Sequence, residues 1–201
     1  MQSKTPDTDM NDNTEYKLAL YHWNQLIQDA CDYTSIELLP QCHSYLLLTL
    51  VRYIQDESLA EQAIEFDLLY DNHELNQNHQ QQLKAQADHC LILAGLFPAQ
   101  LDRHSIRISR YVNLGISCYQ RLSQLVDNDD RYIYEKLADS FVELVDILHT
   151  VRAFTGSPAM PLIQAMELWS DTGSKIAYQA LTSNGQSIPL NETLINQAYK
   201  H

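Results

Sequence analysis

Glycine and proline are scarce in this chain, with 5 and 6 copies among 201 residues. A sandwich or barrel of short strands needs those residues at its turns, so their scarcity argues against an all-β fold. The length suits one domain. A folded chain of this size buries about 70% of the surface that its unfolded form exposes. A hydrophobic core of that extent needs neither disulfides nor a structural metal to be stable.

Positive charge is also scarce. Lysine and arginine together number 13, against 26 aspartates and glutamates, which gives a formal net charge of −13. Such a field repels the phosphates of nucleic acids and the headgroups of anionic membranes. We therefore expect no nucleic acid and no membrane among the partners of this protein.

Long apolar runs and closely spaced cysteines are both missing. The longest apolar stretch, Tyr45 to Val51, contains Thr49 and is followed by Arg52, so it falls far short of the roughly 20 residues that span a bilayer. The N-terminal residues are polar and lack the apolar core of a signal peptide. No CxxC pair occurs among the four cysteines, which we expect to be reduced, mostly buried thiols of a cytoplasmic protein. They are Cys31, Cys42, Cys90 and Cys118.

The short motifs of common active sites are missing as well. The chain contains no G-x-S-x-G, no H-E-x-x-H and no glycine-rich loop of the G-x-G-x-x-G or G-x-x-x-x-G-K type. Those motifs position a nucleophile, a zinc ion or a bound phosphate. We therefore assign no catalytic residue, no metal ligand and no cofactor from the sequence.

Apolar residues recur at helical spacing through most of the chain, which predicts an all-α, single-domain helical bundle of about seven to eight helices. Residues 1–13 are rich in Asp, Asn and Thr, and we expect them to be a disordered N-terminal tail before an all-α domain over 14–201. The helix at 40–55 is apolar almost all round, so we expect it at the centre of the bundle. The predicted helices cover about 14–32, 40–55, 58–70, 83–94, 105–126, 129–154, 157–182 and 191–199.

Two glycines inside predicted helices suggest close packing between helices. Gly115 lies in the apolar stripe of the helix at 105–126, where a side chain would hold two backbones apart. Gly173 lies within the helix predicted at 157–182, and we attribute it to a second close helix crossing.

The predicted helix at 129–154 carries its acidic residues opposite its apolar stripe. At about 100° per residue, Glu135, Asp139, Glu143 and Asp146 fall about 180° from that stripe. Asp146 and His149 form the only acid-x-x-His pair in the chain, a spacing that metal-binding helical bundles use. A metal-dependent helical-bundle enzyme is therefore one hypothesis, but this face is predicted to point into solvent.

Arginines concentrate on one flank of the helix at 105–126, and the next helix carries the densest acidic face. One interpretation is internal pairing of the two, and the other is a basic patch that binds a partner. Asp88 and His89 could serve acid–base catalysis, although adjacent helical residues point in different directions. The residues that we predict to bind a partner around this helix junction are Arg107, Arg110, Tyr111, Asp88, His89 and Phe97.

Three stretches carry a resemblance to known proteins. They are Asp88-His89-Cys90-Leu91 to Pro98, Ile108-Ser109-Arg110-Tyr111 to Gly115, and Leu168-Trp169 to Ser174. Over roughly residues 80–185 the chain resembles a set of uncharacterised bacterial all-helical proteins, which implies a helical fold and no particular activity. Asp88-His89 is also similar to the Asp-His pair of redox-enzyme maturation chaperones, but the acidic-Pro pair that precedes it in that family is absent here.

These observations predict a cytoplasmic, non-enzymatic interaction or regulatory protein that binds another protein. A homodimer is one form that such binding could take. The alternatives are a helical chaperone of the redox-enzyme maturation type and a metal-dependent helical-bundle enzyme.

Overall fold

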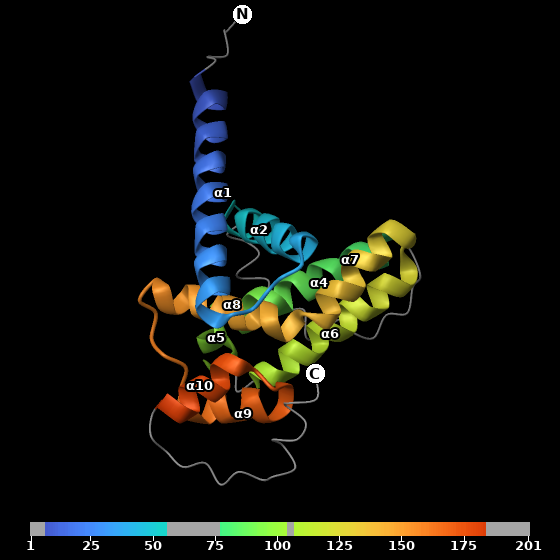
Figure 1. The fold of residues 1–201 in the computed structure, drawn as a ribbon. Helices are drawn as coiled ribbons and strands as arrows, with labels where there is room; N and C mark the ends of the chain where they lie inside the picture. Colours follow the sequence, from blue (N-terminus) through green and yellow to red (C-terminus); the bar gives the residue numbers. More distant parts are fainter. Residues whose placement is uncertain (1–6, 56–76, 104–106, 184–201) are drawn as a thin grey trace, which may run out of the picture.

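The computed structural model describes residues 7–55, 77–103 and 107–183, and these residues form nine α-helices and no strand (Figure 1). The all-α fold class predicted from the sequence is therefore confirmed. The helices predicted at 58–70 and 191–199, and residues 1–6 of the expected tail, lie outside the described residues. The helices are α1 (Asp7–Thr34), α2 (Pro40–Gln55), α4 (Gln77–Leu96), α5 (Pro98–Arg103), α6 (Ile108–Leu125), α7 (Asn128–Asp139), α8 (Phe141–Phe154), α9 (Leu162–Thr172) and α10 (Lys175–Ser183).

The core of the described chain lies between α4, α6 and α8. Helix α4 packs most extensively against α6 and also lies along α8, while α1 and α10 cover α8 from other sides. Every residue of α8 from Leu144 to Val151 is buried. Helix α8 is therefore the central helix, and the central place expected for the helix at 40–55 is wrong. That helix, α2, lies against α1 and α7 and leaves Leu48 54% exposed.

Helix α1 begins at Asp7, seven residues before the expected start at Thr14. Residues 7–13, which we expected to belong to a disordered tail, are thus the first turns of a 28-residue helix. The amino-terminal half of α1 extends past α2 and away from the other helices (Figure 1).

Two of the predicted helices are each divided in two. The helix at 129–154 breaks at Ser140, which has φ −97° and ψ 11° and separates α7 from α8. The helix at 157–182 breaks at Gly173, whose φ of +75° is left-handed and ends α9. No atom lies within 4 Å of a Cβ built on Gly173, so the close crossing that we predicted there is wrong, and the glycine serves as a C-cap.

The close approach predicted at Gly115 is confirmed. A Cβ added to Gly115 would overlap the ring of Phe141 and lie 3.1 Å from the Cβ of Cys90. The glycine thus lets α6 lie directly against α8 and α4.

Candidate functional site

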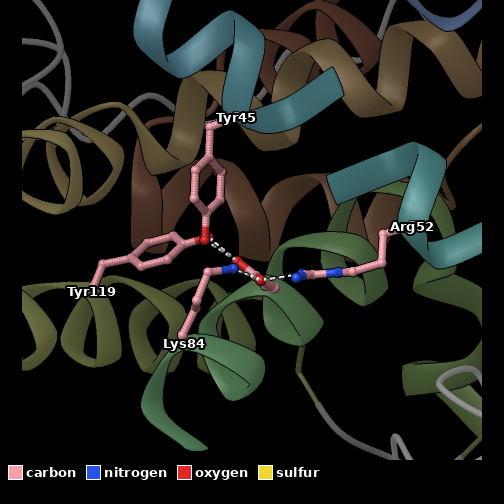
Figure 2. Close-up of polar contacts among 5 residues, drawn as sticks. Tyr45, Arg52, Lys84 and Tyr119 are labelled. Atoms are coloured by element: carbon pink, nitrogen blue, oxygen red, sulfur yellow. Dashed lines mark hydrogen bonds and ion pairs between the residues drawn. The ribbon is translucent and has the colours of Figure 1, made fainter. Parts of the chain in front are cut away.

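The most connected polar group in the described chain is the carboxylate of Asp88 on α4, which is only 4% exposed (Figure 2). The hydroxyls of Tyr45 and Tyr119 donate hydrogen bonds to Oδ1 at 2.6 and 2.7 Å. On the other oxygen, Oδ2, Arg52 Nη2 donates at 2.5 Å and Lys84 Nζ at 2.8 Å. We call these five residues the Asp88 cluster.

Helix geometry explains how three helices supply this cluster. Tyr45 and Arg52 are seven residues apart on α2, which is two turns, so they share one face. Lys84 and Asp88 are an i,i+4 pair on α4, the spacing at which opposite charges meet on a helix surface. Tyr119 comes from α6. The carboxylate therefore joins α2, α4 and α6 through a single buried charge.

The two tyrosines that donate to Asp88 Oδ1 belong to a group of aromatic rings. The ring of Tyr119 is edge-on to Tyr45 at 6.1 Å and stacked on Tyr134 at 6.0 Å. Burial, reinforced by the negative charge of Asp88, raises the pKa of both Tyr45 and Tyr119 well above the usual range. The two hydroxyls consequently stay protonated and act as hydrogen-bond donors.

The arrangement leaves Asp88 little capacity for chemistry. An ionised carboxylate offers about four lone-pair sites, and two hydroxyls and two cations occupy an equal number. A general base needs a free lone pair within reach of a substrate proton. The geometry therefore supports a structural role for Asp88 over the acid–base role that we considered from the sequence.

The two cations of the cluster reach the surface although the anion does not. The side chain of Arg52 is 54% exposed and that of Lys84 is 30% exposed, against 6% for Asp88. Lys84 Nζ also lies 4.9 Å from the ring centroid of Tyr45. Within these five residues, two positive charges accompany one negative charge, in a chain of net charge −13.

The six residues predicted to bind a partner do not form one surface. Asp88 and Tyr111 are each 4% exposed, and His89 is half-buried. Phe97 is 36% exposed and lies 6.2 Å from the ring of Tyr53. Arg107 and Arg110 are exposed where α6 begins, far along that helix from Tyr119. Partner binding by this set stays a prediction, but Asp88 and Tyr111 are not at the surface.

The cationic partners of Asp88 are Arg52 and Lys84, which the sequence analysis did not single out. Asp139, one of the acids expected to match the arginines of α6, forms its ion pair with Lys136 of its own helix at 3.1 Å. The i,i+4 spacing of Lys84 and Asp88 is a local signal that could have identified one of the four partners of Asp88. Tyr45, Arg52 and Tyr119 carry no such signal, because they meet Asp88 only through helix packing.

Asp146 on α8 forms a second buried polar site, and our prediction that it faces solvent is wrong. It is 1% exposed, because α8 begins anew after Ser140 and is covered on all sides. Its carboxylate accepts hydrogen bonds from the Ser174 hydroxyl and, at 2.8 Å, from the backbone N–H of Lys175. Ser174 Oγ in turn accepts the N–H of Ala177 at 3.0 Å. Asp146 thus caps α10 from another helix, and burial raises its pKa to about 6.

His149, one turn after Asp146, is also buried, at 5% exposure. Its Nε2 has no hydrogen-bond partner in the described structure. Burial, with a smaller contribution from the positive charge of Arg152, lowers the pKa of His149 to about 3. In residues 7–55, 77–103 and 107–183, no group of three His, Cys, Asp or Glu side chains is placed to hold a metal ion.

A separate exposed surface lies near the middle of α1. Leu18 is 51% exposed and Tyr21 is 62% exposed. They are three residues apart, so their side chains lie about 60° apart around the helix axis and share a face. Leu and Tyr side chains this open to water form a small apolar surface, which we call the α1 face.

Across the described residues, no helix has the length and apolar character needed to cross a membrane. Comparison of the chain with protein-family models, with curated proteins and with solved structures gave no match in any of the three.

Proposed function

We propose that this chain is a cytosolic, non-enzymatic protein that binds another protein, and that the partner contacts the α1 face. The observation that carries this proposal is the exposure of Leu18 and Tyr21 on α1, a helix whose amino-terminal half extends beyond the other helices (Figure 1). The remainder of α1 packs against α2 and α8. The projecting amino-terminal half is therefore held in one direction.

The energetics of a projecting helix favour a partner there. A helix segment of fewer than about 12–15 residues is only marginally stable in water without tertiary contacts. Burial of one exposed Leu or aromatic side chain contributes about 1.5–3 kcal/mol. Tyrosine is also enriched in protein interfaces. A partner that covers Leu18 and Tyr21 would stabilise both the complex and the helix itself.

The buried polar groups support a non-enzymatic role. The acceptor sites of Asp88 are taken by four donors, and the carboxylate of Asp146 is bound to Ser174 and Lys175. Both carboxylates hold helices together, and neither is presented to a substrate.

Site-specific photo-crosslinking tests the proposal. A photoreactive amino acid replaces Tyr21 in the full chain, and a control variant carries it at Ile163 on α9, which is 74% exposed. After irradiation in cells, we expect a discrete protein adduct from position 21 and none of that mass from position 163. An adduct of twice the mass of the chain would identify a second copy as the partner.

Identical adducts from both positions, or none from position 21, would show that the α1 face is not a binding surface. The control is matched because both positions are exposed apolar residues on helices, at distant places in the fold (Figure 1).

A further inference from the structure

We propose that Arg52 and Lys84 form a binding site for an oxyanion, a phosphate or carboxylate group, which Asp88 positions from beneath. This site lies on α2 and α4 and is separate from the α1 face, so it stands independently of the function proposed above. Figure 2 shows the two cationic side chains converging on Asp88 from different helices.

The first argument is the spacing of the two cations. Arg52 Nη2 and Lys84 Nζ bind the same oxygen of Asp88, at 2.5 and 2.8 Å. The two nitrogens are therefore no more than about 5.3 Å apart. One phosphate or carboxylate group can accept hydrogen bonds from both, because such donors lie about 2.7–2.9 Å from its oxygens.

The second argument is that each cation has donors beyond those that Asp88 uses. A guanidinium carries five N–H donors and an ammonium three, and Asp88 Oδ2 accepts one from each group. Both side chains are partly open to water, at 54% and 30% exposure. Both cations therefore keep N–H donors for an oxyanion while they remain bound to Asp88.

The third argument is preorganisation. Arginine and lysine side chains are long and adopt many rotamers, and a ligand that fixes such a flexible side chain must offset the lost entropy. Here the buried carboxylate already holds both ends, and the Tyr45 ring lies against Lys84 Nζ at 4.9 Å. Asp88 is the only acid among the described residues that forms an ion pair with either cation, so one of the two positive charges is left for the ligand.

The chain supplies a matched control in Lys136. Like Lys84, it pairs with an aspartate of its own helix, Asp139, and its side chain is 34% exposed. It also lies against a tyrosine, with Nζ 5.8 Å from the ring of Tyr132. Unlike Lys84, it shares its carboxylate with no second cation among the described residues. Its substitution therefore measures the effect on anion binding of losing a lysine that pairs with an aspartate alone.

Titration of the full chain with inorganic phosphate, and separately with acetate, tests the site. Ionic strength is kept constant with sodium chloride, and binding is followed by the NMR signal of the Arg52 side-chain Nε–H. We expect a saturable shift of that signal. In Lys84→Gln and Arg52→Gln we expect affinity, followed on neighbouring backbone signals, to fall about fivefold or more because one charge-assisted donor is lost. Lys136→Gln should leave affinity unchanged.

Saturation by phosphate alone would identify a phosphate group as the ligand chemistry, and saturation by acetate would identify a carboxylate. The proposal is overturned if neither anion shifts the Arg52 signal, or if Lys136→Gln weakens binding as much as Lys84→Gln. Circular dichroism of each variant checks the fold. If Arg52→Gln does not fold, the comparison of Lys84→Gln with Lys136→Gln still decides the question.

Discussion

Replacement of His149 by leucine should change how the stability of this protein depends on pH. The imidazole is buried, its Nε2 lacks a hydrogen-bond partner in the described structure, and Arg152 adds to the cost of a proton on it. A leucine of similar size removes the titrating group and the unpaired nitrogen together. At neutral pH the substitution should therefore be tolerated, with a change in unfolding free energy below about 1.5 kcal/mol.

The magnitude at acid pH follows from the pKa values. The pKa of His149 falls from 6.5 to about 3 on folding, so its contribution to stability is present above pH 6.5 and is lost as the pH falls toward 3. One pH unit corresponds to about 1.4 kcal/mol. The loss between pH 6.5 and pH 4 is then about 3 kcal/mol in the native protein, and the leucine variant does not suffer it.

Asp146 changes the stability of the protein in the opposite direction between pH 6.5 and pH 4. Burial raises its pKa from 3.8 to about 6 on folding, against the lowering effect of the hydrogen bonds from Ser174 and Lys175. Its contribution is fully present below pH 3.8 and is lost as the pH rises through 6, again by about 3 kcal/mol. In the native protein the two groups nearly offset each other between pH 6.5 and pH 4.

Urea unfolding of both proteins at about pH 7 and about pH 4 measures the effect, because the slope of stability against pH counts the protons bound on unfolding. The difference in unfolding free energy between His149→Leu and the native protein should grow by about 3 kcal/mol in favour of the variant at the lower pH. A difference that stays constant with pH would refute a neutral, buried His149.

Two further predictions follow from packing and surface charge. Gly115→Ala should lower the midpoint of urea unfolding. The overlap of the new Cβ with Phe141 costs about 1–3 kcal/mol, which exceeds the gain in helix propensity of about 1 kcal/mol. An unchanged or higher midpoint would contradict the close contact seen there. If the exposed arginines of α6 bind a partner, Arg107→Ala combined with Arg110→Ala should reduce the partner recovered by affinity capture, and unchanged recovery would exclude that patch.

Helical periodicity was enough to predict the fold class, the range of α2 and the tight contact at Gly115. It could not locate the helix breaks. Ser140 is neither glycine nor proline, so no local residue type marks the break between α7 and α8. Gly173 is visible in the sequence, but a glycine can indicate close packing or a left-handed cap, and only the φ angle separates the two.

The error at Ser140 explains why Asp146 and His149 were placed in solvent. A face assigned by counting 100° per residue holds only while the helix is continuous. Burial of α8 on every side then brings polar residues of any face inside the protein. The Asp88 cluster was missed for a different reason. Its partners on α2 and α6 lie 31 to 43 residues away in sequence, and the packing of helices, which brings them together, leaves no pattern in a single sequence.

Two buried carboxylates are seen in the described part of the chain, and they are stabilised in different ways. The difference determines where cationic side chains are held. Asp146 is bound by a hydroxyl and a backbone N–H at the start of α10, so the partial positive charge of that helix end helps to balance it. No cationic side chain of the described residues donates a hydrogen bond to it. Asp88 instead takes one N–H from Arg52 and one from Lys84. In a chain with twice as many acids as bases, most carboxylates have no cation to spare, yet Asp88 holds two. The second cation is explained if it binds a ligand. The basic surface is therefore to be sought between α2 and α4, as well as at the arginines of α6 where the sequence first placed it.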